Sequence, residues 1–294
     1  MSARTLAAVA GALTLAAGVA AGASGCSRVT LTSLPDGIAV SVHQNRPDTE
    51  DRRLQVRITN GSESAVTITS LEFASPRFAE AAEYAKAPTT IRSGGVTDLP
   101  VDLPPPECSQ SDPDAQAHVT IDFVLHDGHS GSASVVPDDP LTQLDGISER
   151  DCLDVAISRV AAITPPDELR VETIEGRPVA NLDVSIAPTG ADGAFTIESV
   201  DDTVLFGLHD PASATPAENL SLGIDVHGDD PPRTLTIPLV PARCDAHAVA
   251  EDKRGTLMPL RVTTQDSSGI VYLAMPESVK GQLYEYLNGA CTDR

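Results

Sequence analysis

Aromatic and basic residues are both scarce in this sequence. It has no tryptophan, four tyrosines and five phenylalanines. Proteins that stack sugars or bases use exposed aromatic side chains for that purpose, so a glycan-binding module is disfavoured. The 20 lysines and arginines are opposed by 42 aspartates and glutamates, which leaves a net charge of −22. Because phosphate binding requires clusters of basic residues, we expect no nucleic-acid partner.

Recognisable catalytic motifs are also absent. The sequence has no His-Glu-x-x-His, no Gly-x-Ser-x-Gly, no phosphate-binding glycine loop and no dinucleotide fingerprint. Gly128-His129-Ser130-Gly131 has a superficial likeness to a nucleophile motif, but it falls in a predicted turn. We therefore predict that the protein is not an enzyme and uses no cofactor.

One pair of histidines has a spacing compatible with a metal site. His126 and His129 share a predicted turn, and two imidazoles could hold copper or zinc if a third ligand came from elsewhere. No third ligand can be named, so a solvated turn is the preferred interpretation and a metal carrier is the alternative. The cysteines have no Cys-x-x-Cys spacing for zinc, and the acidic clusters match no EF-hand loop.

The N-terminal 25 residues have the composition of an export signal. Arg4 precedes an uncharged, apolar stretch from Thr5 to Gly25, which is typical of a secretory signal peptide. The stretch ends in Ala23-Ser24-Gly25-Cys26, which resembles the bacterial lipobox. That resemblance implies cleavage before Cys26 and attachment of diacylglycerol to its sulfur. The alternative is cleavage after Ala23, which would release a secreted protein.

The number of cysteines agrees with lipid attachment at Cys26. The sequence has 5 cysteines, and an odd cysteine in an exported protein requires an explanation. A thioether between Cys26 and the lipid would explain the odd cysteine, and it leaves four cysteines to pair. The two acyl chains of a diacylglycerol are enough for stable membrane anchoring.

The remainder of the chain contains an internal repeat. Several short motifs return at one constant offset, and further motifs return with small gaps. The clearest pairs are Ser27-Arg28-Val29 with Ser158-Arg159-Val160, Pro35-Asp36 with Pro166-Asp167, Val40 with Val171, and Leu54-x-Val56-x-Ile58 with Leu182-x-Val184-x-Ile186. The sequence therefore predicts a signal peptide at residues 1–25, a first module at 26–157 and a second at 158–294.

Each copy has the pattern of an all-β module. Alternating apolar residues indicate about seven short half-buried strands, and glycine- and proline-rich turns separate them. We interpret this as two tandem immunoglobulin-like β-sandwich modules, each with a short C-terminal helix, at residues 141–150 and 278–288. Another small sandwich or an open barrel remains the alternative. Residues 78–86 suggest an additional short helix, Asn60-Gly61 and Thr189-Gly190 suggest hairpin turns, and Pro165-Pro166 suggests a stiff linker between modules.

The repeat also predicts how the four remaining cysteines pair. Val101-x-Leu103-x-Pro105-x-x-Cys108 returns as Ile237-x-Leu239-x-Pro241-x-x-Cys244, and Cys152 matches Cys291 near the end of each copy. Since each copy owns two cysteines, we predict the disulfides Cys108–Cys152 and Cys244–Cys291.

These features together resemble a group of uncharacterised actinobacterial exported lipoproteins. The likeness rests on the alanine-rich signal with its lipobox, on the strand segment RITNGSESAVTITSLEF and on the PARC strand end. It implies an address on the extracytoplasmic face of the cell membrane but no activity. We expect a non-enzymatic binding or accessory protein with another envelope protein as its partner.

Overall fold

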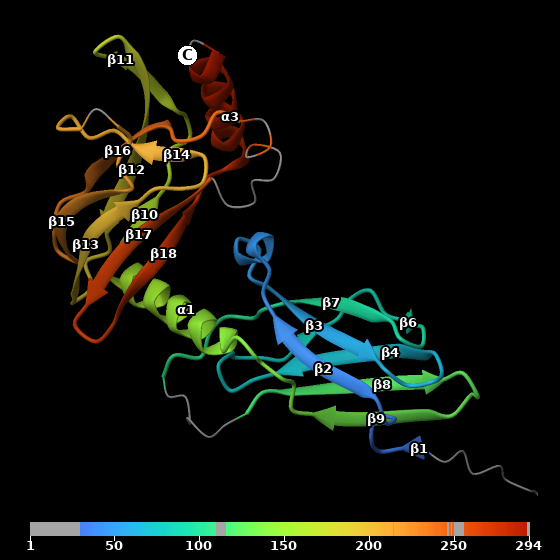
Figure 1. The fold of residues 1–294 in the computed structure, drawn as a ribbon. Helices are drawn as coiled ribbons and strands as arrows, with labels where there is room; N and C mark the ends of the chain where they lie inside the picture. Colours follow the sequence, from blue (N-terminus) through green and yellow to red (C-terminus); the bar gives the residue numbers. More distant parts are fainter. Residues whose placement is uncertain are drawn as a thin grey trace, which may run out of the picture.

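The computed structural model describes residues 30–109, 116–213, 215–245, 247, 249 and 256–292. The chain forms two β-rich lobes joined by a long helix (Figure 1). The predicted signal peptide of residues 1–25 and the predicted lipid site at Cys26 lie outside the described residues. Within the described part of the chain, no helix has the length and apolar character needed to cross a membrane.

The N-terminal lobe contains two sheets. The larger has the strand order β1-β9-β8-β4-β5, with β6 also paired to β4, and the smaller has the order β2-β3-β7. The elements are β1 (Thr30–Leu31), β2 (Ile38–His43), the 3-10 helix η1 (Arg46–Thr49), β3 (Arg53–Asn60), β4 (Val66–Ala74), β5 (Ala82–Glu83), β6 (Thr89–Ile91), β7 (Val96–Asp102), β8 (His118–Leu125) and β9 (Ser130–Val135).

The C-terminal lobe also contains two sheets. One has the order β10-β12-β16-β14, with β11 also paired to β12, and the other has the order β15-β13-β17-β18. The strands are β10 (Ala161–Thr164), β11 (Arg170–Ile174), β12 (Arg177–Pro188), β13 (Ala194–Asp201), β14 (Phe206–Leu208), β15 (Asn219–His227), β16 (Arg233–Pro241), β17 (Leu257–Thr264) and β18 (Ser268–Ala274). Helix α3 (Glu277–Thr292) follows the last strand.

The two lobes share a strand arrangement. The order β2-β3-β7 corresponds to β10-β12-β16, and β9-β8-β4 corresponds to β18-β17-β13. The register of β4 shifts between Ile68 and Ser70, and that of β13 shifts between Ile197 and Ser199. A bulge of this kind bends its strand, so both lobes carry the same local distortion at matching places.

Each lobe has its own hydrophobic core. The alternating residues of β3 and β12 point into these cores, and Leu54, Val56, Leu182 and Val184 are all 0% exposed. Burying each such side chain contributes about 1.5–3 kcal/mol. The predicted hairpins at Asn60-Gly61 and Thr189-Gly190 are wrong, because β3 and β4, like β12 and β13, belong to different sheets.

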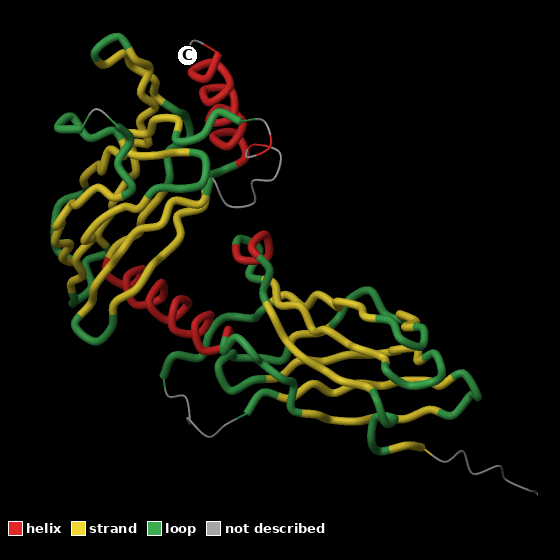
Figure 2. Tube along the Cα trace, viewed as in Figure 1, coloured by secondary structure: helices red, strands yellow, loops and turns green. Residues whose placement is uncertain are grey.

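Helix α1 (Gln143–Val160) connects the lobes and belongs to both cores. Leu144 and Ile147 lie in the N-terminal core, whereas Leu153 and Ile157 lie in the C-terminal core. Figure 2 shows the helix running from one set of strands to the other. The module boundary predicted between residues 157 and 158 therefore falls inside α1, and the segment from Pro165 to Pro166 lies between β10 and β11 of one sheet.

The helix suggested for residues 78–86 is wrong. Phe78 follows a turn in which its N–H donates to the Ser75 carbonyl, and β5 then pairs with β4. Phe78 is only 5% exposed, and its ring centroid lies 6.3 Å from that of Phe73. The apolar residues of this segment thus complete the edge of a sheet.

Candidate functional site

The four described cysteines form two disulfides in the predicted pairs. Cys108 bonds to Cys152 and Cys244 bonds to Cys291, each with a Cα–Cα distance of 5.5 Å. Cys152 lies in α1 and Cys291 lies in α3, so each bond fastens the segment after β7 or β16 to a helix. On the chain-entropy model, each cross-link stabilises the fold by roughly 4 kcal/mol.

The predicted histidine turn joins β8 to β9. His126 and His129 are both exposed there. The His129 N–H donates to Asp127, and His129 Nδ1 lies 3.0 Å from Asp127 Oδ2. These contacts with His129 hold the pKa of the Asp127 carboxyl below its ordinary value. Among the described residues, no three His, Cys, Asp or Glu side chains are grouped so that they could hold a metal ion.

The Gly-His-Ser-Gly segment has a structural role in the same hairpin. Gly131 pairs with Phe123 in the ladder between β8 and β9. A Cβ atom on Gly131 would lie 2.5 Å from the Phe123 ring and 2.8 Å from Leu31. The glycine is therefore required by close packing of the neighbouring strands.

A second polar cluster lies on the small N-terminal sheet. Arg57 donates two hydrogen bonds to Asp98, at 2.7 Å and 2.9 Å, and holds the pKa of that carboxyl below its ordinary value. His43 Nε2 is buried, lies 3.6 Å from Asp98 Oδ2 and makes no hydrogen bond within the described structure. The cluster links β2, β3 and β7 across their outer face and contains no nucleophile.

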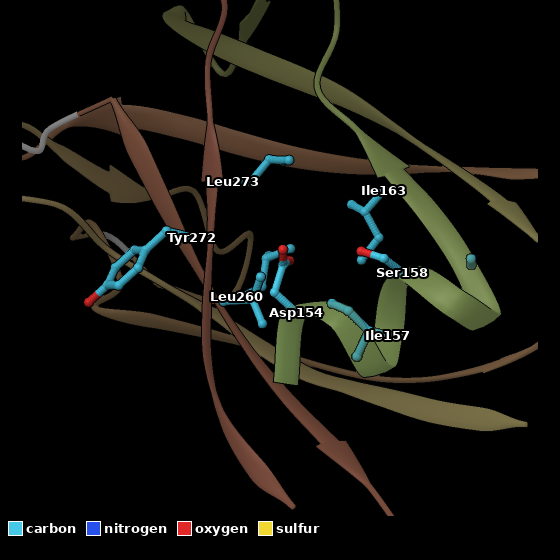
Figure 3. Close-up of a pocket in the computed structure, with 9 residues that line it drawn as sticks. Asp154, Ile157, Ser158, Ile163, Leu260, Tyr272 and Leu273 are labelled. Atoms are coloured by element: carbon cyan, nitrogen blue, oxygen red, sulfur yellow. The ribbon is translucent and has the colours of Figure 1, made fainter. Parts of the chain in front are cut away.

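A cavity of about 120 Å³ lies between α1, β10, β17 and β18. Its apolar walls include Ile157, Leu260 and Leu273, and its polar groups include Asp154 and Ser158. Figure 3 shows the Asp154 carboxyl in the middle of the cavity, with the Ser158 oxygen directed toward it and the Tyr272 ring pointing away. The space is sufficient for several water molecules or a small organic group.

Asp154 is an exposed residue, so the cavity opens to solvent, but its surroundings still disfavour the charged carboxylate. Burial raises the pKa of Asp154 above its ordinary value of 3.8, and repulsion by Asp151 raises it further, while Arg52 opposes both. Apolar surroundings disfavour the charged form of an acid, and so does a neighbouring carboxylate. The cavity can therefore accommodate a small group that neutralises Asp154 or donates a hydrogen bond to it.

Arg52 connects this helix to the N-terminal lobe. Its guanidinium donates to Asp151 at 2.7 Å and to the Pro104 carbonyl at 2.9 Å. Arg52 has a positive φ of 50°, which turns the chain just before β3. The Asp151 side chain is 11% exposed. The Cys108–Cys152 bond and this ion pair therefore attach adjacent residues of α1 to the same lobe.

A further contact joins the lobes directly. Lys280 of α3 donates to Glu50, which precedes β3, and to Glu277 at 2.9 Å. Burial alone would lower the pKa of Lys280, but the hydrogen bonds to Glu277 and Glu50 outweigh it and the pKa is raised. Arg150 of α1 lies over the Tyr272 ring at 5.9 Å. The two lobes are therefore connected by the contact between Lys280 and Glu50 as well as by α1.

The sequence carries no signal for the cavity. Asp154, Leu260 and Leu273 are brought together only because α1 continues past its predicted end and packs against β17 and β18. Their alternating or helical spacing predicts burial, and burial alone does not distinguish a cavity from solid packing.

No known protein family and no curated protein sequence matches the chain. Among solved structures, red sea bream transglutaminase is 9% identical with a TM-score of 0.22, and the match covers 83% of this chain and 32% of that chain. A chaperone–tip adhesion subunit complex from the Csu pili of Acinetobacter baumannii is 9% identical with a TM-score of 0.18, over 77% of this chain and 93% of that chain. The CupB2 chaperone of Pseudomonas aeruginosa is 11% identical with a TM-score of 0.18, over 77% of this chain and 95% of that chain. This chain spans about a third of the transglutaminase, and all three TM-scores are too low to support an argument about fold or function.

Proposed function

We propose that this protein is a lipid-anchored, extracytoplasmic binding or accessory protein of the cell envelope, without enzymatic activity. It would consist of two immunoglobulin-like modules that arose by duplication and have kept one disulfide each. The corresponding strand orders and the matching bulges in β4 and β13 support the duplication. The observation that carries the proposal is helix α1, whose residues contribute to both hydrophobic cores.

A helix shared by two cores supports a scaffolding role. Because buried residues of α1 belong to each core, the lobes cannot rotate independently without exposing apolar surface. The Cys108–Cys152 bond and the Arg52–Asp151 ion pair secure the same helix to the N-terminal lobe. Such a frame presents two sets of loops at a constant separation, which suits the binding of a single protein partner at two places.

The two disulfides support an extracytoplasmic address. Disulfides persist in oxidising compartments and are rare in the bacterial cytosol. Both are positioned to stabilise the fold, since each joins a strand end to a packed helix. Lipid attachment at Cys26 would then place the two lobes at the outer face of the membrane.

Two polar side chains, Asp154 and Ser158, reach the cavity. Asp154 is its one ionisable side chain apart from the Tyr272 phenol, whose ring points away from the space. No imidazole, amine or thiol of the described residues lines it, so we assign the cavity no catalytic role. The alternative metal carrier at His126 and His129 is supported by no observation, since the described residues bring no third ligand to the turn.

The lipid anchor is tested by replacing Cys26. The native chain and Cys26→Ala would be expressed in a bacterium with an alkyne-tagged fatty acid in the medium, and the cells then fractionated. We expect the native chain to carry the label and sediment with membranes, and Cys26→Ala to be unlabelled. A native chain without label, or a Cys26→Ala chain that carries as much label, would refute the anchor.

The partner is sought with the same two chains. Mild crosslinking of intact cells should join the native chain to one envelope protein in a constant ratio. Cys26→Ala serves as the control for contacts that depend on the membrane address. Recovery of many unrelated proteins in equal amounts would count against a dedicated partner.

A further inference from the structure

The described chain starts at one end of the N-terminal lobe. Its first strand, β1, pairs in parallel with β9, so that Thr30 lies opposite Ser130 and Leu31 lies opposite Gly131. Ser130 is the first residue of β9, and β1 therefore begins beside the turn that joins β8 to β9. Helix α1 leaves the lobe at the other end, toward the C-terminal lobe (Figure 1).

Three more connections lie at the end where β1 begins. The start of β4 pairs with the ends of β6 and β8, and the start of β2 pairs with the end of β3. The Gly61 N–H donates to the Gly37 carbonyl at 2.8 Å, and the Gly94 N–H donates to the Asn60 carbonyl at 2.7 Å. These contacts group four connections, which we call the tip of the lobe: residues 32–37, 61–65, 92–95 and 126–129.

The tip has no strong attraction for lipid of its own. None of the exposed large apolar side chains of the described chain belongs to it, so nothing there is suited to insertion into a bilayer. Among the exposed side chains of the tip, carboxylates outnumber guanidinium groups. These charged residues are Asp36, Glu63, Asp127 and Arg92. A contact between the tip and a membrane therefore depends on how the chain is attached to that membrane.

We propose that the tip faces the lipid headgroups of the membrane that carries the anchor, and that the C-terminal lobe is held away from that membrane. This orientation rests on the proposed lipid attachment at Cys26. Four residue steps separate Cys26 from Thr30, and a fully extended chain covers at most about 14 Å in four steps. The start of β1 then stays within that reach of the lipidated residue, and the tip stays beside it.

Length and charge keep the opposite end of the lobe off the membrane. Strand β8 has 8 residues, so it separates that end from the tip by about 26 Å. Exposed carboxylates at that end and along α1 include Asp138, Glu149 and Asp154, and an anionic lipid surface repels them. The C-terminal lobe follows along α1 and is therefore the membrane-distal part, where a protein partner can reach its loops.

Energy transfer from a dye on the protein to dyes in the lipid measures which end lies closer to the membrane. The full chain, purified with its fatty-acid label, would be added to vesicles of phosphatidylethanolamine and phosphatidylglycerol that contain rhodamine-labelled lipid. The donor dye would be attached to His126→Cys in the tip, to Leu141→Cys at the other end of the same lobe, or to Val171→Cys in the C-terminal lobe. All three positions are exposed. Transfer should be at least about twofold stronger from His126→Cys than from Leu141→Cys, and weakest from Val171→Cys.

The matched control lengthens the segment between Cys26 and Thr30. A Gly-Ser insertion of about twelve residues after Arg28 adds an average reach of about 20 Å. The fatty-acid label and the binding to vesicles should persist, while the difference in transfer between His126→Cys and Leu141→Cys should fall by at least half. A native chain without the label would refute the anchor, and this orientation with it. A labelled chain in which both positions transfer equally, or in which the insertion leaves the difference intact, would overturn the orientation while the anchor stands.

Discussion

Asn60 illustrates how a single residue determines the path between two sheets. Its side chain is 0% exposed, donates to the Ser64 and Ile91 carbonyls, and accepts from the Ser62 hydroxyl at 2.6 Å. A buried amide with all its partners present stabilises one local conformation, because losing any partner leaves a desolvated polar group. Asn60 therefore fixes the crossing from β3 to the opposite sheet.

The sequence indicates a turn at Asn60-Gly61 but does not distinguish a hairpin from a crossing. In a hairpin and in a crossing alike, polar residues lie between two strands whose apolar and polar residues alternate. The difference lies in distant partners of Asn60, such as Ile91, which local spacing does not contain. The cavity residues could not be predicted for the same reason: Asp154, Leu260 and Leu273 are far apart in the sequence and line one space only in the folded lobe.

Neutralising Asp154 should stabilise the protein at neutral pH. Because its pKa is raised in the folded state, folding favours the protonated carboxyl, and stability falls as pH rises from below 3.8 through the folded pKa. Asp154→Asn should therefore be more stable than the native chain at pH about 7, by less than about 1 kcal/mol because solvent screens a partly exposed group. Urea unfolding at neutral and acidic pH measures the difference.

The control is Glu149→Gln, which removes one negative charge from an exposed position of the same helix. It separates the local effect at the cavity from a general reduction of the net charge. An Asp154→Asn protein that is less stable than the native chain at neutral pH would show that the carboxylate makes a favourable contact there. The gain should disappear below the ordinary pKa of the carboxyl, where both proteins carry a neutral side chain.

At the scale of elements, strands were easier to predict than helices. The alternation of Leu54, Val56 and Ile58, and of their repeats, correctly predicts half-buried strands in β3 and β12. Helix α1 was predicted as a shorter segment that ended near Arg150. Its apolar residues do not form one continuous face, because Ile147 points into one core and Ile157 into the other. A search for a single apolar stripe therefore underestimates the length of this helix.

Truncating side chains near the two ends of α1 should destabilise different lobes. Ile147→Ala and Ile157→Ala each remove a buried side chain, at 3% and 2% exposure, and each should cost about 2–5 kcal/mol. Hydrogen exchange should show faster opening of β4 and β8 in Ile147→Ala, and of β13 and β17 in Ile157→Ala. Equal acceleration of both sheets in both variants would mean that the lobes unfold only as one unit.

At the scale of the whole molecule, the two lobes are joined by several attachments of unequal strength. The ion pair of Lys280 with Glu50 is half-buried, with side chains 16% and 32% exposed, and an ion pair that solvent still reaches contributes about 0–1 kcal/mol. The buried residues of α1 contribute far more, and the helix passes from one lobe to the other without a break. The orientation of the lobes should therefore depend on the continuity of α1 and hardly at all on Lys280.

This ranking can be tested by breaking the helix between the two cores. Glu149 is exposed and lies between Ile147 and Leu153, so its replacement disturbs neither core directly. Proline there removes a helical hydrogen bond and kinks the helix, at a cost of about 3 kcal/mol. Spin labels on the exposed positions Val96 and Val204 report the distance between the lobes. Glu149→Pro should broaden that distance distribution, while Glu149→Ala and Lys280→Gln should leave it narrow. If Lys280→Gln broadens it as much as the proline does, the Lys280–Glu50 contact rather than the shared helix holds the lobes in place.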